Sequence, residues 1–429
     1  MKRDVKINFI IPPNPYLGDD RRNVPLGILY VASMAESAGY DVSITDLRGI
    51  CAEEWRNAIA EADVYSIVAA TPDYPLAVTI AKTVKAMHES SLTVLGGTHA
   101  TCVPEEIGKE FDKVVIGEGE LAFLDILDDF RNNKSNKRFY HRELIKDLDS
   151  IPFPARHMLP FNSLFSKNAL AVGGESTGTI ITSRGCPNSC SFCANTKVWR
   201  RKIRFRTPDN VTDEIKQIIY KYGIKSFRFQ DDNLLFKKDR MVELCKKMEP
   251  LGIKWRGLAR LDSLNDLSVL KLMKKAGCLE LGFGIESLMQ EVLDKNSKAV
   301  KLKDIHSAFE NMRQAELKSR IFLILGLPGE RKGFTKRLND FLDNENPYAV
   351  NIATMVPYPG TDIYNNPEKY NIKLKTKDFS QYLMSVGLME HEADKPLIFE
   401  HDCLTEDEIL EERKKAFVLL KSRNKIKNF

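Results

Sequence analysis

Short apolar segments alternate with amphipathic helical segments along most of this 429-residue chain, and that alternation limits the possible fold more than any other feature. Between residues 5 and about 130 the apolar segments are rich in valine and isoleucine, as expected of strands buried on both faces. They read VKINFII, DVSITDL, VYSIVAA, LTVLGG and KVVIGEG. Five β-α units in this order predict an α/β domain over residues 1–130, with a doubly wound five-stranded parallel sheet of the Rossmann or flavodoxin-like kind.

A second series of strand-helix units follows residue 177. Its strands read TGTIITS, SFRFQDD, KWRGLAR, LELGFGIES, SRIFLILGLPG and AVNIATMVPYPG. Six parallel units predict a partial (β/α)6 TIM-like barrel over residues 177–370, with its site at the C-terminal ends of the strands. The polar, proline-containing segment 131–176 is expected to be a linker. Residues 371–429 are expected to form a helical extension that packs on the barrel through Ile409, Ala416, Val418 and Leu419.

The composition is that of a globular protein that is neither secreted nor embedded in a membrane. Apolar residues make up 43% of the chain and charged residues 29%. The apolar runs are shorter than the ~20 residues of a membrane span, and the N-terminus has no apolar stretch followed by a cleavage site. We therefore expect a cytoplasmic protein with no membrane partner. The 64 basic and 59 acidic residues leave a net charge of +5, too small to predict nucleic-acid binding.

Three of the eight cysteines, Cys186, Cys190 and Cys193, are spaced C-x3-C-x2-C directly after a predicted strand. Since an unsecreted chain keeps its thiols reduced, this spacing indicates metal binding or catalysis. Three thiolates can hold a [4Fe–4S] cluster and leave its fourth iron open to another ligand. Zinc is the alternative, with a fourth ligand supplied through the fold. The remaining cysteines are expected to be small buried hydrophobic residues: Cys51, Cys102, Cys245, Cys278 and Cys403.

The cysteine spacing, the strand before it and the aromatic Phe192 resemble the signature of the radical SAM enzymes. The resemblance implies that S-adenosylmethionine binds the open iron and is cleaved reductively to a 5′-deoxyadenosyl radical. Polar residues that follow later strands stand in the order of the family's S-adenosylmethionine motifs, including GIES at the ribose. The residues implied to contact S-adenosylmethionine are Phe192, Asp231, Asp232, Arg260, Glu286, Ser287 and Gly326. Glu330 lies one position away from the usual spacing and receives no role.

The first predicted domain resembles the cobalamin-binding domain that precedes the barrel in many radical SAM enzymes, through VLGGTHATCVPEE and VVIGEGE above all. Cobalamin domains of mutases carry DxHxxG, whereas the corresponding stretch here is Asp46-Leu47-Arg48-Gly49. The resemblance therefore implies cobalamin without a histidine ligand from that loop. The segment Thr71–Tyr74 is the best candidate for the lower face of cobalt, and His99 is a possible contact that could equally bond to backbone. The implied cobalamin contacts are Pro13, Asn14, Arg48, Thr71, Asp73, Tyr74, Gly96, Gly97, His99, Gly117 and Glu118.

Together these resemblances cover roughly residues 5–365 and imply a cobalamin-dependent radical SAM methyltransferase. Its cofactors would be a [4Fe–4S] cluster, S-adenosylmethionine and methylcobalamin. It would methylate an unactivated carbon of a small-molecule or peptide substrate and receive electrons from a donor such as flavodoxin or ferredoxin. The sequence shows no Ser-His-Asp set or other protein nucleophile, and this chemistry would need none.

Three alternatives remain open. A cyclase, oxidase or rearrangement enzyme of the same family would use the same cofactors without net methyl transfer. A methylthiotransferase acting on tRNA would carry a second cysteine-rich site near the N-terminus, but only Cys51 and Cys102 precede residue 150. A non-catalytic metal-binding protein that binds nucleic acid is weakened by the small net charge.

Overall fold

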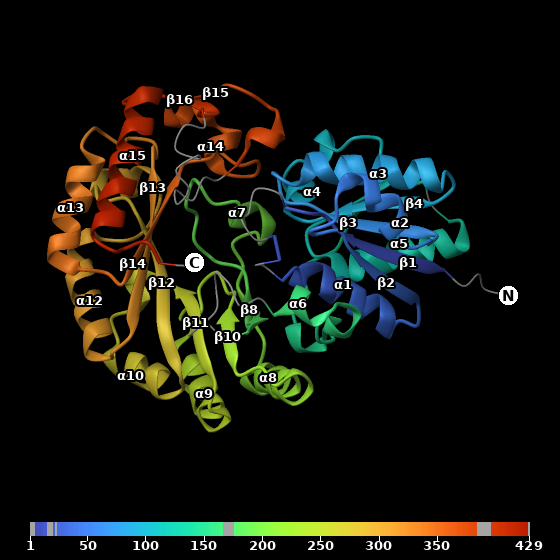
Figure 1. Ribbon diagram of the computed structural model, residues 1–429, viewed down its shortest axis with the longest axis horizontal. Coiled ribbons are helices and arrows are strands. Elements are labelled where there is room, and N and C mark those ends of the chain that lie inside the picture. The colour runs from blue at the N-terminus through green and yellow to red at the C-terminus, as the bar shows by residue number, and fades with distance from the viewer. Residues whose placement is uncertain are drawn as a thin grey trace. The chain divides into compact units, whose positions relative to one another are not determined.

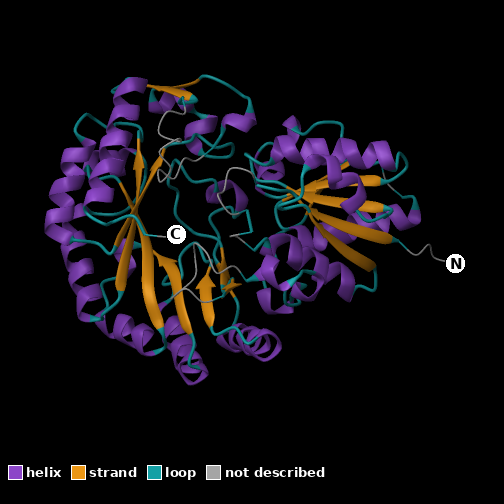
Figure 2. Cartoon of the chain, viewed as in Figure 1, coloured by secondary structure: helices purple, strands orange, loops and turns teal. Residues whose placement is uncertain are grey.

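The computed structural model describes residues 5–14, 20–21, 24–134, 136–165, 176–383 and 396–427. These residues form two compact α/β units, drawn in Figures 1 and 2. The first unit comprises the chain up to residue 166 together with Lys197–Trp199 and Asp378–Gln381, and the second comprises the rest. The main sheet of each unit is entirely parallel, as the sequence predicts.

The first unit is built on a sheet with the strand order β2-β1-β3-β4-β5-β6. Its strands are β1 (Lys6–Ile11), β2 (Asp41–Asp46), β3 (Val64–Val68), β4 (Leu92–Gly96), β5 (Lys113–Ile116) and β6 (Phe139–His141). Its helices are α1 (Leu26–Ser37), α2 (Trp55–Ala58), α3 (Tyr74–Met87), α4 (Thr98–Cys102), α5 (Gly119–Asn132) and α6 (Phe161–Leu164). Helix α1 packs against α5 and α2 against α3, and helices lie on both faces of the sheet (Figure 2). The strand order reverses at β1, which is the doubly wound arrangement.

Strand β6 is the difference from the expected five strands. It comes from the predicted linker and pairs in parallel with β5 through Val114 and Phe139. The Tyr140 side chain is buried, and its hydroxyl donates to Asp129 Oδ2 at 2.9 Å. The strand has only three residues and follows the polar run RNNKSNKR, so it is too short to show a periodic pattern in the sequence.

The second unit has the strand order β14-β13-β12-β11-β10-β7, so all six predicted barrel strands form one curved sheet. These strands are β7 (Thr177–Ile180), β10 (Ser226–Phe229), β11 (Lys254–Ala259), β12 (Cys278–Glu286), β13 (Lys318–Leu325) and β14 (Ala349–Thr354). Two short pairs accompany it, β8 (Ser183–Arg184) with β9 (Arg204–Phe205), and β15 (Ile372–Leu374) with β16 (Phe399–His401). The helices are α7 (Asn195–Val198), α8 (Pro208–Tyr222), α9 (Lys238–Met248), α10 (Leu267–Lys275), α11 (Gln290–Lys295), α12 (Ile305–Gln314), α13 (Phe334–Glu345), α14 (Asp362–Asn365) and α15 (Glu406–Ser422).

Helix α8 shows how the sequence sets these elements. Val211, Ile215 and Ile218 form its buried face. Thr207 caps the start by accepting a hydrogen bond from Asn210 N at 3.2 Å. Gly223 ends the helix in the left-handed conformation, with φ of 69°, as its position in the sequence predicts.

Inward-facing side chains of the barrel strands stack in layers below the site. At the amino ends of the strands, Glu280 lies between Arg256 at 3.3 Å and Arg320 at 2.7 Å. One layer higher, a Cβ on Gly282 would lie 2.8 Å from Leu258 and 2.9 Å from Phe322, so only glycine fits between them. This layer forms the base of a cavity at the carboxyl ends of the strands.

Helix α15 forms as expected, but its buried face differs from the predicted one. Ile409, Ala416 and Leu420 are buried, whereas Val418 is 65% exposed. The prediction for Val418 was wrong because the buried positions recur every three or four residues from Ile409, which leaves 418 on the outer face.

The cysteines outside the C-x3-C-x2-C motif differ in how deeply they are buried. Cys245 and Cys278 are buried, as predicted, and Cys102 is half-buried. Cys51 and Cys403 are exposed, so the expectation of buried hydrophobic residues was wrong for these two.

Candidate active site

A cavity of about 220 Å³ lies in the second unit at the carboxyl ends of β10, β11 and β12. It is lined by Cys186, Asn188, Cys190, Phe192, Cys193, Asn195, Asp232, Leu258, Ala259, Arg260, Gly282, Phe283, Gly284, Glu286, Lys298 and Phe322. The fold thus gathers the three cysteines with four of the residues that the resemblance assigns to S-adenosylmethionine: Phe192, Asp232, Arg260 and Glu286. It does not bring Asp231, Ser287 or Gly326 to the cavity wall.

The three thiols are held in a largely dry environment. Cys190 is buried, and Cys186, which accepts a hydrogen bond from Asn188 Nδ2 at 3.2 Å, is half-buried like Cys193. Burial raises the pKa of Cys190 and raises the pKa of Cys193 to about 12. Because metals bind the thiolate, loading this loop releases protons.

The spread of the three sulfur atoms disfavours zinc. Four ligands around one zinc ion lie about 3.8 Å apart for Zn–S bonds of about 2.3 Å. Among the residues that the structure describes, only His401, Asp402 and Cys403 bring three such ligand atoms within 4.8 Å of one another. The Sγ atoms of Cys186, Cys190 and Cys193 thus do not all lie within that distance of one another, which suits a four-iron cluster, since such a cluster binds each cysteine through a different iron.

Asp231 lies beneath the cavity and supports the loop that leads to Cys186. Its carboxylate accepts hydrogen bonds from Thr182 N at 3.2 Å, Thr182 Oγ1 at 2.8 Å and Ser183 Oγ at 2.5 Å. Arg240 Nη2 donates to Thr182 O at 2.9 Å, so every polar group of Thr182 is bonded. Burial raises the pKa of Asp231, and these hydrogen bonds oppose that rise.

Asn296 supports the other half of the cysteine loop. Its Oδ1 accepts a hydrogen bond from Ser191 Oγ at 2.8 Å, and its backbone oxygen accepts from Ser191 N at 3.0 Å. Its Nδ2 donates to Val292 O in α11 and, at 3.0 Å, to Pro328 O in the loop after β13. This fully buried side chain therefore joins the cysteine loop to two other segments of the barrel.

Asp232, next to Asp231, reaches the cavity instead. It accepts a hydrogen bond from Asn195 Nδ2 at 2.7 Å. Burial raises its pKa, and the neighbouring Asp231 adds to that rise. The two carboxylates therefore have different surroundings, Asp231 at the loop before Cys186 and Asp232 at the cavity.

Glu286 enters the cavity from a left-handed backbone, with φ of 72°. Its Oε1 lies 2.8 Å from Lys298 Nζ, and both side chains are almost completely buried. Arg260, on the same wall, bonds to Asp262 at 3.0 Å and to Ala299 O at 3.1 Å. The cavity therefore presents two cations and two carboxylates beside the three thiols.

Ser287 and Gly326 lie away from this cavity. Ser287 Oγ is 3.5 Å from Glu330 Oε2, and burial raises the pKa of Glu330, which also pairs with Arg337. A Cβ on Gly326 would touch Ile409 and Phe399 at 3.4 and 3.5 Å, so this glycine packs against the C-terminal extension.

A second group of predicted site residues meets at the carboxyl ends of the strands of the first unit. His99 Nδ1 lies 3.2 Å from Thr71 Oγ1, and its ring packs against the Tyr74 ring with centroids 4.2 Å apart and planes tilted by 30°. Asn14 Nδ2 donates to Asp73 Oδ1 at 3.1 Å. A Cβ on Gly97 would lie 2.6 Å from Ala69 O, so only glycine fits there.

Burial changes the charge of this group and leaves two polar atoms without partners. It lowers the pKa of His99 to about 4 and raises the pKa of Asp73 to about 6, so His99 is neutral at pH 7. His99 Nε2 and Asn14 Oδ1 are buried and form no hydrogen bond with the residues that the structure describes. Because such atoms are costly to leave unpaired, this edge suits a polar ligand.

Comparison with protein families identifies both domains. Residues 180–337 match the radical SAM superfamily, and residues 22–127 match the B12-binding domain. The chain is a cobalamin-dependent radical SAM enzyme. Its cofactors are a [4Fe–4S] cluster, S-adenosylmethionine and cobalamin, and the proteins to which it is similar include methyltransferases and cyclases.

Three similar proteins illustrate this cobalamin-dependent radical SAM family. An uncharacterised methyltransferase of Pyrococcus horikoshii is 29% identical, over 83% of this chain and 81% of its own. An anaerobic magnesium-protoporphyrin IX monomethyl ester cyclase of Rubrivivax gelatinosus is 26% identical, over 86% of this chain and 70% of its own. The structure of the methyltransferase TsrM of Kitasatospora setae, with cobalamin and a [4Fe–4S] cluster bound, has a TM-score of 0.71 at 14% identity, covering 98% of this chain and 89% of TsrM.

Both candidate sites of the radical SAM enzyme fit their cofactors. Three convergent thiols in a cavity with cationic and anionic walls suit a cluster and a zwitterionic amino acid. Unpaired buried polar atoms beside a close backbone approach suit a ligand that carries amide groups.

Several predicted cobalamin residues have structural partners of their own. Arg48 is buried and pairs with Asp46 at 2.8 Å. Glu118 accepts a hydrogen bond from Ile145 N at 2.8 Å, and Gly117 N donates to Thr101 Oγ1 at 3.0 Å. Gly96 ends β4, and Pro13 is half-buried just after β1.

The sequence did not indicate Asn188, Asn195 or Lys298 as part of the cavity. Asn188 and Asn195 flank cysteines of the motif, so proximity was an available signal. Lys298 follows α11 in a charged segment, and nothing in the sequence indicated that it would reach the cavity.

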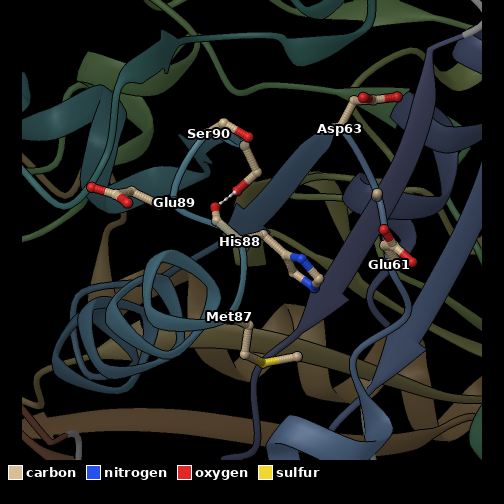
Figure 3. A pocket seen from close by; sticks show the side chains of 8 residues that line it. Glu61, Asp63, Met87, His88, Glu89 and Ser90 are labelled. Atoms are coloured by element: carbon tan, nitrogen blue, oxygen red, sulfur yellow. Dashed lines mark hydrogen bonds between the residues drawn. The ribbon is translucent and has the colours of Figure 1, made fainter.

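Two other polar features are separate from these sites. Figure 3 shows an open hollow of about 560 Å³ lined by Glu61, Asp63, His88, Glu89 and neighbouring residues. It lies where β3 and β4 begin, at the amino ends of the strands and opposite the edge that binds ligands. At His401, Nδ1 accepts from the backbone N–H groups of Cys403 and Leu404 while Nε2 lies 3.0 Å from Leu327 O, so both nitrogens are occupied.

No helix in the described ranges has the length and apolar content needed to cross a membrane.

Proposed function

We propose that this enzyme methylates an unactivated carbon of a small-molecule or peptide substrate. The observation that carries the proposal is the convergence of three cysteines with Asp232, Arg260 and Glu286 in one cavity. When bound, the cluster and S-adenosylmethionine supply a radical that removes a substrate hydrogen, and cobalamin supplies the methyl group. The protein binds and orients these groups and excludes water.

The cavity residues have distinct proposed roles. Cys186, Cys190 and Cys193 hold the cluster. Asp232 binds the ammonium group of S-adenosylmethionine, and Arg260 attracts its carboxylate.

Three further cavity residues complete the proposed S-adenosylmethionine site. Glu286 accepts hydrogen bonds from the ribose hydroxyls, and Lys298 fixes its position. Phe192 supplies an apolar wall next to the last cysteine.

Asp231, Ser287 and Gly326 support the site indirectly in this proposal. Asp231 fixes the loop before Cys186, and Ser287 bonds to the buried Glu330. Gly326 allows the C-terminal extension to pack closely on the end of β13.

On the first unit, we propose that the segment Thr71–Tyr74 faces the lower side of cobalt. His99 packs against Tyr74 and would offer its neutral Nε2 to cobalamin. Gly96, Gly97 and Gly117 would let the backbone approach the ligand, and Pro13, Arg48 and Glu118 would line the same edge.

The first test is anaerobic reconstitution with iron, sulfide and hydroxocobalamin, followed by metal analysis. We expect about four irons and one cobalt per chain. Cys190→Ala should lose iron and the cleavage of S-adenosylmethionine but keep cobalt, whereas Cys245→Ala, at a buried cysteine outside the cavity, should keep all three. Four irons without cobalt would refute the methyl-transfer proposal, and zinc in place of iron would refute the radical SAM role.

A second candidate is a cyclisation or oxidation without net methyl transfer, favoured by the similarity to the cyclase of Rubrivivax gelatinosus. The products distinguish the two reactions. Methyl transfer forms S-adenosylhomocysteine together with 5′-deoxyadenosine, whereas the other reactions form only 5′-deoxyadenosine. Candidate substrates can therefore be screened for both products.

A further inference from the structure

One aromatic side chain from late in the chain packs against the predicted cobalamin residues of the first unit. The segment Asp378–Gln381 is part of that unit, although the sequence on either side of it belongs to the second. It contains the short 3-10 turn Phe379–Gln381, which packs against α3. Asp378 and Gln381 are exposed, whereas Phe379 is only 9% exposed. The segment therefore adds an aromatic ring to the buried part of the first unit.

The polar residues of this segment fix its shape. Asp378 Oδ1 accepts hydrogen bonds from Ser380 N at 3.1 Å and from Ser380 Oγ at 2.7 Å. Asp378 Oδ2 accepts from Gln381 Nε2 at 3.0 Å. Aspartate bonds to the backbone that follows it in turns of this kind. The turn is thus held by its own side chains, and Phe379 is the residue with which it packs inward.

Phe379 completes the surroundings of His99. Its ring meets the His99 ring edge to face, with centroids 4.6 Å apart and planes at 74°, and it lies 6.2 Å from the Tyr74 ring. The Tyr74 hydroxyl is held in turn, because it accepts a hydrogen bond from Gly108 N at 2.8 Å. On the imidazole itself, Nδ1 lies 3.2 Å from Thr71 Oγ1. Two aromatic rings and one hydroxyl therefore set the orientation of His99.

This packing leaves Nε2 as the atom of His99 that a ligand can use. His99 is fully buried, and Nε2 forms no hydrogen bond with the residues that the structure describes. Burial lowers the pKa of His99 to about 4, so the ring is neutral at pH 7. When Nδ1 carries the proton and donates to Thr71, Nε2 has an accepting lone pair. That lone pair suits an amide N–H donor, and cobalamin carries amide groups around its corrin ring.

We propose that Phe379 is a positioning residue of the cobalamin site, which keeps water from His99 Nε2 and holds the imidazole ready to accept a hydrogen bond from a cofactor amide. The inference rests on the proposed placement of cobalamin at this edge of the first unit. Without the Phe379 ring, water would reach Nε2, and the cofactor would have to displace that water and immobilise a freer imidazole.

The test measures the affinity of the full-length, cluster-reconstituted protein for hydroxocobalamin by equilibrium dialysis, with cobalt determined by elemental mass spectrometry. The test variant is Phe379→Ala, and Phe379→Leu keeps an apolar cover at the same place. The matched control is Phe139→Ala, which removes a half-buried ring of the same unit at the start of β6. His99→Leu, alone and combined with Phe379→Ala, shows whether Phe379 acts through His99.

We expect Phe379→Ala to raise the Kd for hydroxocobalamin about tenfold and Phe379→Leu to raise it less than about threefold. Phe139→Ala should bind like the wild type. In the His99→Leu background, Phe379→Ala should cause no further loss, because the acceptor that it protects is gone. An unchanged Kd for Phe379→Ala, or an equal loss with and without His99, would overturn the inference.

Amide hydrogen exchange on the wild type makes the test independent of whether a variant folds. Hydroxocobalamin should slow exchange in peptides that cover Phe379–Gln381, because the bound cofactor fixes His99 and with it the ring that packs on it. Exchange at Phe379–Gln381 that is the same with and without the cofactor would contradict the positioning role. Failure of the wild type to retain cobalt would instead refute the proposed function.

Discussion

The carboxylate of Asp231 is predicted to stabilise the barrel although it does not line the cavity. In Asp231→Asn, an amide oxygen in the place of Oδ1 keeps three hydrogen bonds from Thr182 and Ser183 but loses its charge. The NH2 group replaces Oδ2, so the second bond from Thr182 N, at 3.2 Å, is no longer made. Each bond to a charged acceptor is worth roughly 1 kcal/mol more than a neutral one, and one unmade bond costs about 1–3 kcal/mol more. The sum is about 4–6 kcal/mol, and the lower cost of burying a neutral amide, which the raised pKa of Asp231 indicates, reduces it toward about 4 kcal/mol.

Asp232→Asn is the matched control, because it changes the neighbouring carboxylate, which has Asn195 as its partner and keeps one accepting oxygen. We expect a cost below about 1 kcal/mol for this variant. It should nevertheless weaken binding of S-adenosylmethionine to the reconstituted enzyme, since its proposed partner is the ammonium group.

Amide hydrogen exchange, read by mass spectrometry on peptides that cover Ile181–Arg184 and β10, measures both effects on the iron-free protein. A loss of about 4 kcal/mol corresponds to exchange faster by roughly 10³ when opening is the limiting equilibrium. If Asp231→Asn speeds exchange by less than tenfold, or by no more than Asp232→Asn, the assignment of a supporting role to Asp231 is wrong.

Three further predictions concern other buried positions. Gly97→Ala should destabilise the first unit by more than about 2 kcal/mol in thermal unfolding, because φ is 100° and the new Cβ would lie 2.6 Å from Ala69 O. As the control, Gly39→Ala should cost only about 1 kcal/mol, because φ is 84° but no atom lies within 4 Å of its Cβ. Glu280→Gln should cost about 3 kcal/mol in urea unfolding because Arg256 and Arg320 share this carboxylate, whereas the exposed Glu316→Gln should be neutral. On acidification from pH 7 to 4, the contribution of His99 to the free energy of unfolding falls, because the unfolded chain takes up the proton near pH 6.5 and the folded protein only near pH 4. The contribution of Asp73 rises, because its pKa is about 6 in the folded protein and 3.8 in the unfolded chain. The two terms, each about 3 kcal/mol, nearly cancel, so His99→Gln should become more stable on acidification and Asp73→Asn less stable; slopes of the same sign in chemical denaturation would contradict both assignments.

The main sheets were predictable because parallel strands buried on both faces leave continuous apolar runs between helices. The five runs predicted in the first unit form β1–β5, and the six predicted in the barrel form β7 and β10–β14. Strand β6 was not predictable because its three residues gain their place from pairing with β5, which is a tertiary effect.

At the site, the cysteine spacing predicted the metal ligands because all three lie on one loop. The Asp231-Asp232 pair could not be separated by sequence, since the direction of each side chain depends on where β10 ends. Lys298 was missed for a similar reason. It is far from the cysteines in sequence, and only the return of the chain after α11 places it beside Glu286.

The bonds of Asn296 have a consequence for protein engineering. Transplanting the twelve residues from Thr182 to Cys193 onto another barrel would carry the ligands but not the partners that shape them. Ser191 would need an asparagine from a distant segment, and Thr182 would need an aspartate at the end of the second barrel strand. A portable version of this metal-binding peptide therefore comprises three separate pieces of chain, and a graft that lacks either outer piece should bind iron without a defined geometry.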